Sequence, residues 1–102
     1  MVAFLAARPT AKRLHIDEID VHRSHQGHGI GRRMILEAIA WARENGFLTI
    51  SLTTFRSIPW NGPFYASLGF GEWIDPPPAI KALLADEAEK GLKDRWAMRL
   101  DL

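Results

Sequence analysis

The sequence contains no cysteine and a single tyrosine among its 102 residues. The lack of cysteine excludes a disulfide scaffold, a thiolate zinc site and a thiol nucleophile, and it is compatible with the cytoplasm. Lysine and arginine exceed aspartate and glutamate by only 13 to 12, so the chain has no overall field for nucleic acid or an anionic membrane. No run approaches the roughly 20 apolar residues of a membrane helix. The opening "MVAFLAARPTAKR" also lacks the charged segment that precedes the apolar run of a signal peptide. We therefore expect a cytoplasmic protein in which any anion site is local.

The chain is long enough for one domain and too short for a two-domain cofactor enzyme. Its first part predicts a β-hairpin. "VAFLAAR" at 2–8 is short and apolar, "PTAK" supplies a turn, and "RLHIDEIDVH" alternates apolar and polar residues as far as residue 22.

The alternation in the second strand slips by one residue. Leu14 and Ile16 fall on one face, whereas simple alternation puts Ile19 and Val21 on the other. This slip predicts a β-bulge at the acidic pair 17–18, and bulges often lie beside active sites.

A helix follows, because apolar residues recur at helical spacing while charged residues face elsewhere. The apolar positions are Ile30, Met34, Ile35, Ala38, Ile39, Trp41 and Ala42. Gly46 in "ENG" is expected to end this helix in a left-handed conformation. "FLTISLTT" then alternates Leu48, Ile50 and Leu52 with polar residues, which predicts a strand and hence a right-handed βαβ unit.

The remaining segments predict two more helices and two more strands. "SIPWNGPFYASLGF" reads as a loop and a short helix over 64–68 that stops at Gly69, and "FGEWI" as a strand. "DPPP" is an extended linker, "AIKALLADEAEKG" a helix ended by Gly91, and "DRWAMRLDL" a final strand.

The glycine-rich stretch "VHRSHQGHGIGRRM" lies between the second strand and the first helix. A helix N-terminus presents N–H groups without intrahelical acceptors, and glycines let the main chain curl around an anion there. Arg32 and Arg33 are unfavourable in a first helical turn unless an anion compensates their charge. The stretch therefore predicts a phosphate or pyrophosphate site, with a ligand-free turn as the alternative.

Other readings of this stretch are weaker. No Gly-Lys-Ser or Gly-Lys-Thr of a Walker loop occurs, and arginine or methionine stands where a dinucleotide fingerprint needs its third glycine. His22, His25 and His28 invite a zinc site, but their spacing of three residues and the glycine-rich backbone orient the rings poorly. We expect no metal.

The stretch matches the pattern Gln/Arg-x-x-Gly-x-Gly/Ala through Gln26, Gly29 and Gly31. Downstream, "PWNGPFYASLGF" has an asparagine before a Phe-Tyr-x-x-Leu-Gly-Phe helix. Together they resemble the GNAT superfamily of acetyltransferases, from about Leu14 to Phe70, and the last strand suits the family as well. The resemblance implies an α/β fold of three layers: a mixed, mainly antiparallel twisted sheet with flanking helices.

The resemblance also implies a function, which is acetyl transfer from acetyl-coenzyme A to a primary amine of a small molecule or peptide. Tyr65 matches the tyrosine that protonates the departing thiolate, although a core aromatic is the alternative. Glu18 is the best candidate for the base, with Asp20 and His22 as runners-up and a solvated acidic strand face as an equal alternative. The residues implied in cofactor binding are Ile19, Val21, Gln26, Gly27, His28, Gly29, Ile30, Gly31, Arg32 and, as a weaker transfer, Asn61.

Compared with the family, the chain lacks the first strand, helices and second strand, so we expect one domain over 1–102 that is short at its N-terminus. The segment 2–8 is then an apolar edge strand, which predicts a homodimer; the alternative is that this chain is shorter than the functional protein. A non-catalytic acyl-coenzyme A binding or regulatory module is the second hypothesis. A nucleic-acid-binding domain has little support, because no basic stripe emerges.

Overall fold

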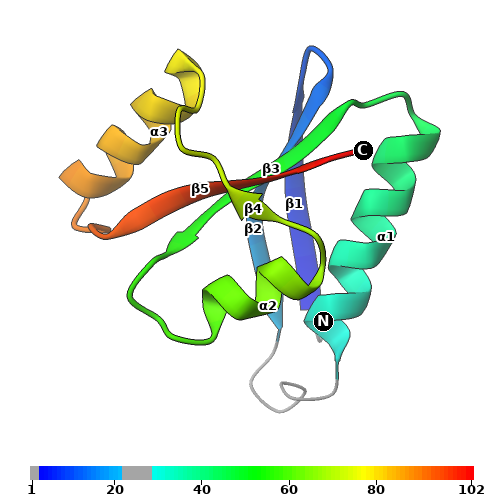
Figure 1. Ribbon diagram of the computed structural model, residues 1–102, viewed down its shortest axis with the longest axis horizontal. Coiled ribbons are helices and arrows are strands. Elements are labelled where there is room, and N and C mark those ends of the chain that lie inside the picture. The colour runs from blue at the N-terminus through cyan, green and yellow to red at the C-terminus, as the bar shows by residue number, and fades with distance from the viewer. Residues whose placement is uncertain (1–2, 22–28) are drawn as a thin grey trace. The chain divides into compact units, whose positions relative to one another are not determined.

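A computed structural model describes residues 3–21 and 29–102. In chain order, the elements are β1 (Ala3–Thr10), β2 (Arg13–Val21), α1 (Ile30–Glu44), β3 (Thr49–Phe55), α2 (Asn61–Ser67), β4 (Gly71–Glu72), α3 (Pro78–Glu89) and β5 (Arg95–Asp101) (Figure 1). The strands form a five-stranded mixed sheet in the order β1-β2-β3-β5-β4, which confirms the α/β class. The chain divides into two compact units, Met1–Ser51 with Asp101–Leu102, and Leu52–Leu100.

The hairpin of β1 and β2 is antiparallel and its loop is shorter than the sequence predicted. Thr10 pairs with Arg13, which leaves only Ala11 and Lys12 in the loop, and Ala11 adopts a φ of 52°. Pro9, which we had assigned to the turn, continues β1. It is tolerated because β1 is the outermost strand, where a missing N–H breaks no ladder hydrogen bond if it faces outward.

The structure confirms the bulge. The consecutive residues Ala6 and Ala7 pair with Glu18 and Ile16, so that Asp17 is the extra residue on β2. Residues that pair lie on the same face of a sheet.

The bulge decides which apolar residues share a face. Ile16 pairs with Ala7 and Ile19 pairs with Leu5, so the two isoleucines lie on the same face. A regular strand would have put them on opposite faces, and the extra Asp17 removes that conflict.

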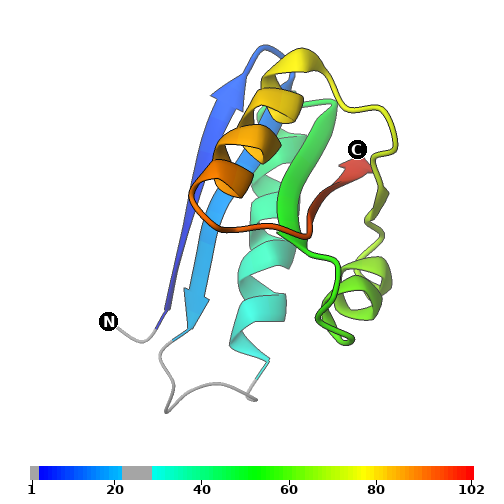
Figure 2. The same ribbon diagram turned by 90° about the vertical axis from the view of Figure 1, so that its left-hand side faces the viewer.

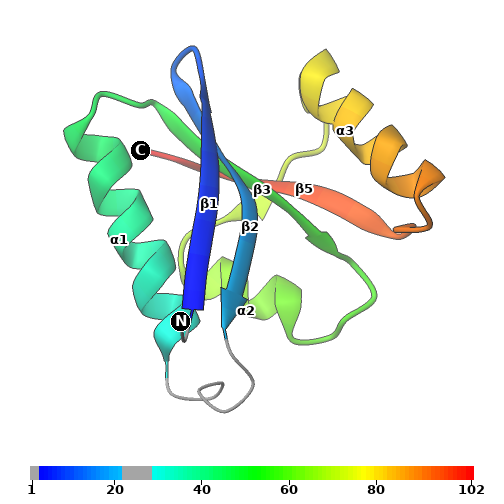
Figure 3. The same cartoon turned by 180° about the vertical axis from the view of Figure 1, so that it is seen from behind.

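Helix α1 packs against β1 and β2, and Figure 3 shows it beside the hairpin. It buries Ile35, Ile39 and Ala42, as the helical spacing predicted. The assignment of Trp41 to this buried face is wrong, because its side chain is 50% exposed and its ring stacks on Phe47 with centroids 5.8 Å apart.

The end of α1 confirms the predicted cap. Gly46 has a φ of 79°, and the preceding Asn45 N–H donates to the Trp41 carbonyl. β3 begins at Thr49, so Leu48 lies just before the strand and does not face the core as the alternation predicted. The Leu48 side chain is 61% exposed, and its N–H donates to the carbonyl of Lys12 at the hairpin tip (2.7 Å).

In the second unit, α2 begins at Asn61, three residues before the predicted start, because Pro63 fits the first turn, where its missing N–H is unneeded. It ends before Gly69, whose φ of 101° lets the chain reverse and whose Cβ, if present, would lie 3.1 Å from the Leu100 side chain. The predicted strand "FGEWI" is only two residues long, β4, paired antiparallel with β5.

Helix α3 is joined to β3 and β5 by a closed group of polar contacts. The Arg95 Nε donates to Glu87 Oε1 (3.0 Å), and its Nη2 donates to the Thr53 hydroxyl (3.0 Å). The Thr53 hydroxyl in turn donates to Glu87 Oε2 (3.1 Å). The two charged side chains are only 18% and 14% exposed, so this group fixes α3 in place through paired, largely desolvated charges.

Within 3–21 and 29–102, the structure contains no helix that is both long and apolar enough to span a membrane.

Candidate functional site

The N-terminus of α1 has the form of an anion-binding end. Gly29 precedes the helix with φ 73° and ψ 12°, a left-handed conformation that residues with a side chain adopt only with strain. The N–H groups of Ile30, Gly31 and Arg32 occupy the first turn and have no intrahelical carbonyl acceptor. Among residues 3–21 and 29–102, no side chain caps this end, and the first turn contains no acidic residue. The available donors and the helix dipole together favour a bound anion.

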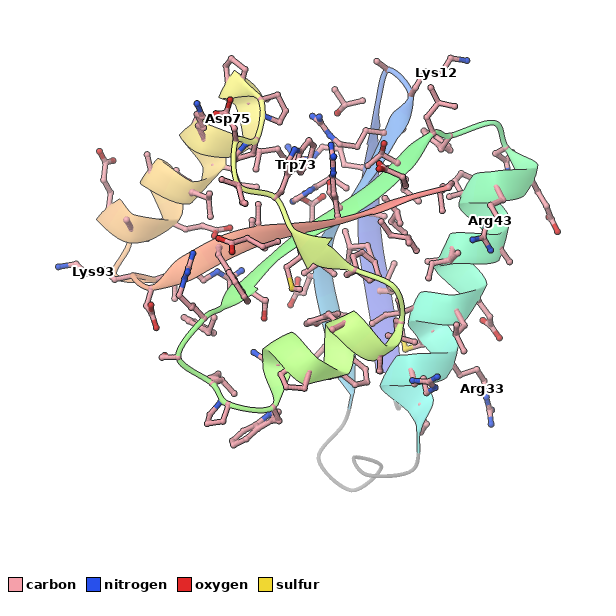
Figure 4. The ribbon with its side chains drawn as sticks, viewed as in Figure 1. Lys12, Arg33, Arg43, Trp73, Asp75 and Lys93 are labelled. Carbon is pink, nitrogen blue, oxygen red and sulfur yellow. The ribbon has the colours of Figure 1, made fainter. Side chains whose placement is uncertain are left out.

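Positive charge lies on the same turn. Arg32 and Arg33 are exposed, and Figure 4 shows Arg33 directed away from α1 near its first turn. The predicted contacts of Gln26, Gly27 and His28 lie outside the residues that the structure describes.

The bulge of β2 contains two carboxylates, Asp17 and Glu18. Asp17 is held by Arg8 through two hydrogen bonds, 2.6 Å and 3.2 Å long. Glu18 and Asp20 are exposed. The assignment of Glu18 as the base, with Asp20 as a runner-up, stays a prediction.

The predicted pantetheine contacts lie at the end of β2. Ile19 is half-buried and Val21 is the last residue of the strand. Ile19 pairs with Leu5 and Val21 pairs with Ala3 on β1, and the contact of both with the cofactor stays a prediction.

Tyr65 is placed in the second unit, on α2, with its side chain 9% exposed. Its ring meets Phe64 and Phe70 edge to face, with centroids 5.1 Å and 6.0 Å apart. Burial raises the pKa of the Tyr65 phenol above its ordinary value, and the positive charge of Arg95 opposes this rise in part. The phenol is therefore protonated at neutral pH, as a proton donor must be.

Asn61 begins the same helix and has a structural partner. Its side-chain amide donates to the hydroxyl of Thr54 on β3 (3.0 Å), which anchors the start of α2 on that strand. The other predicted role of Asn61, contact with the cofactor, stays a prediction.

Two polar features were not anticipated from the sequence. The action of Arg95 on Tyr65 had no sequence signal, because the residues are 30 positions apart and only folding brings them together. His15 and Ser51, on β2 and β3, form a buried hydrogen bond of 2.8 Å, in strands where alternation alone would assign such residues to solvent.

The described part of the chain contains no cluster of three or more histidine, cysteine or acidic side chains suited to a metal ion. His22, His25 and His28 lie outside it.

The model of the acetyltransferase (GNAT) family matches residues 1–70, which is more than half of the chain. The chain belongs to the GNAT acetyltransferase family. The matched range contains both the N-terminal turn of α1 and Tyr65.

Solved structures agree with this assignment. The chain resembles a Bacillus subtilis acetyltransferase in complex with coenzyme A at 23% identity and a TM-score of 0.80, covering 100% of this chain and 70% of the other. It resembles the ribosomal-protein-S18-alanine N-acetyltransferase of Escherichia coli at 24% identity and a TM-score of 0.78, covering 99% and 61%. It also resembles the PaiA N-acetyltransferase of Thermoplasma acidophilum in complex with coenzyme A. The identity is 16% and the TM-score is 0.74, and the match covers 99% of this chain and 54% of the other. The GNAT chain thus spans between 54% and 70% of the length of these three proteins.

Proposed function

We propose that this GNAT protein transfers an acetyl group from acetyl-coenzyme A to a primary amine of a small molecule or peptide. The single observation that carries the proposal is the start of α1, where a left-handed Gly29 precedes the backbone N–H groups of the first helical turn in a chain of this family. Two of the similar structures contain coenzyme A, which supports the choice of ligand. We place the reaction in the cytoplasm, in keeping with the absence of cysteine.

In this proposal the pyrophosphate binds at the start of α1. The N–H groups of Ile30, Gly31 and Arg32 donate to its oxygens, and the Arg32 side chain adds positive charge at the rim. Gln26, Gly27 and His28 supply the preceding part of the loop by resemblance to the family. The backbone of Ile19 and Val21 holds the pantetheine and the acetyl group.

The reaction needs one proton removed and one supplied. The amine nitrogen attacks the thioester carbon, a C–N bond forms, and the C–S bond breaks to release the thiolate. Tyr65 donates its phenolic proton to this sulfur, a role that fits its protonated state at neutral pH. Glu18 accepts a proton from the amine, directly or through water, and the phenol is later reprotonated from solvent.

A second candidate function is binding of an acyl-coenzyme A without catalysis. The chain spans 54% to 70% of the length of the three similar proteins. Both functions require cofactor binding, and only the enzyme predicts turnover of an amine substrate.

Isothermal titration with coenzyme A tests the part that both functions share. We expect saturable binding at millimolar ligand or below, and its absence would refute both. Turnover with a panel of small amines and peptides, followed by thiol release, separates the enzyme from the binding module.

The roles of individual residues are tested by matched substitutions. Tyr65→Phe keeps the ring and removes the proton, so it should lower kcat roughly 100-fold or more while changing the Kd for coenzyme A little. Glu18→Gln should lower kcat, and Asp20→Asn, on the same strand, should preserve it. Equal activity of Tyr65→Phe and the parent chain would remove the acid role, and a reversed result for the two carboxylates would transfer the base to Asp20.

A further inference from the structure

Helix α2, which carries Tyr65, rests on one face of β5. A Cβ added at Gly62, in the first turn of α2, would lie 3.6 Å from Trp96 Cζ2. Just after the helix, a Cβ at Gly69 would lie 3.1 Å from the Leu100 side chain. Trp96 and Leu100 are four residues apart on β5, so they lie on the same face of the strand. Tyr65 therefore belongs to a helix that contacts β5 at both of its ends.

The opposite face of β5 packs against α3. Arg95, which directly precedes Trp96, donates to Glu87 of α3, and consecutive residues of a strand point to opposite faces. Figure 2 shows α2 (green) and α3 (yellow to orange) on opposite sides of β5 (red). The side chain of Trp96 therefore lies on the α2 side of the strand, where it can affect the position of that helix.

The ring of Trp96 is held by an arginine. The Arg56 guanidinium lies over the ring, with its Cζ 4.4 Å from the ring centroid, which is within the range of a cation–π attraction. Arg56 Nη2 donates to Glu72 Oε2 on β4 (3.1 Å), and the Arg56 backbone N–H donates to the Asp94 carbonyl (2.8 Å). No described residue accepts a hydrogen bond from the buried indole nitrogen of Trp96. Stacking on Arg56 and packing on α2 therefore set the orientation of the ring.

We propose that Arg56 is a positioning residue that holds the Trp96 ring against α2 and thereby keeps the Tyr65 phenol in place for proton transfer. This inference rests on the proposed function, in which Tyr65 protonates the departing thiolate. Catalysis depends on exact placement, and a displacement of about 1 Å can cost roughly 100-fold in rate. The side chains of Arg56 and Glu72 are 54% and 38% exposed, so either can be replaced without removing a buried side chain.

A double-mutant cycle tests whether Arg56 acts through Tyr65. Arg56→Met should lower kcat roughly tenfold and leave the KM for the amine and the Kd for coenzyme A within about twofold. In the Tyr65→Phe background, where no phenolic proton remains, Arg56→Met should lower kcat no further. Arg99→Met is the matched control and should keep the kcat of the parent chain, because Arg99 also lies over a tryptophan, Trp73 (5.3 Å), but on the face of β5 opposite to Trp96. An equal loss of kcat in both backgrounds would overturn the proposal.

The phenolate titration of Tyr65, the only tyrosine, gives a second readout that needs no turnover. Arg56→Met should loosen α2 and admit water to the phenol, so the phenolate should form at a lower pH than in the parent chain. The positive charge that acts on Tyr65 is that of Arg95, which the variant keeps, so this shift reports lost burial. Arg99→Met should titrate as the parent chain does.

This titration separates the positioning role from the proposed function. If no amine is acetylated, the proposed function fails, and a lower titration of Tyr65 in Arg56→Met still supports the positioning role. An unchanged titration in a folded Arg56→Met variant, checked by circular dichroism, would overturn it. Glu72→Gln loosens the guanidinium without removing it and should shift the titration in the same direction by less. It takes the place of Arg56→Met if that variant does not fold.

Discussion

Gly29 and Gly46 allow a direct test of whether the start of α1 is an anion site or only a turn. The two glycines flank the same helix at opposite ends, with φ values of 73° and 79°, and a Cβ at either would meet nothing within 4 Å. Replacement by alanine therefore costs only backbone strain at both positions. We predict that Gly29→Ala and Gly46→Ala lose similar stability and that only the former loses affinity for coenzyme A.

The size of each effect follows from the backbone. An L-residue in the left-handed region costs about 1 to 2 kcal/mol, and the smaller entropy of the unfolded alanine chain returns part of this. A net loss of about 1 kcal/mol lowers the Tm of a domain of this size by roughly 4 to 8 °C. In Gly29→Ala, the displaced N–H groups should also lose a charge-assisted hydrogen bond to the ligand, which weakens binding roughly tenfold.

Thermal unfolding by circular dichroism measures the first effect and calorimetric titration with coenzyme A the second. Gly71→Ala is a control, because Gly71 is exposed, its φ is not in the left-handed region and its Cβ has open space. Gly29→Asn should recover part of the lost stability, since asparagine tolerates a positive φ. Equal loss of affinity in Gly29→Ala and Gly46→Ala would refute the anion site, because strain alone would then explain both.

Three further predictions concern the second unit. The phenolate absorbance of Tyr65, the only tyrosine, should appear at a higher pH than that of a free phenol, and stability should fall as pH rises through this raised pKa. Tyr65→Phe should abolish both effects. Titration of Tyr65 at the pH of a free phenol would contradict its burial. Glu87→Gln leaves Arg95 largely buried without its countercharge and should lower the free energy of unfolding by about 1 to 3 kcal/mol in a denaturant titration. An unchanged free energy of unfolding would show that the ion pair of Glu87 and Arg95 does not stabilise the fold. A double-mutant cycle of Asn61→Ala and Thr54→Val should give a coupling of about 1 kcal/mol, and additivity would deny that their hydrogen bond anchors α2.

Local patterns predicted most of the secondary structure. The helical spacing from Ile30 onward, Gly46 at its end and the bulge at residue 17 all follow from short-range sterics and periodicity, and all three are confirmed. Two assignments of core residues failed, Trp41 near the end of α1 and Leu48 just before β3. Periodicity gives the direction of a side chain and says nothing of how far the neighbouring elements extend to cover it.

Part of the candidate site was predictable because it depends on the local sequence alone. A glycine-rich turn before a helix identifies a set of backbone donors without knowledge of the rest of the chain. The environment of Tyr65 could not be read in this way, because burial by Phe70 and the charge of Arg95 depend on where distant segments fold.

The sequence by itself determined the family, the order of the elements and the left-handed conformation at Gly46, since motif spelling and backbone sterics act over a few residues. Only the tertiary structure decided that the Tyr65 phenol is buried, that Asp17 binds Arg8, and that Glu87 of α3 pairs with Arg95 of β5. These properties depend on pairing and burial between residues far apart in the chain. Such contacts form only when the whole chain folds, and no local pattern records them.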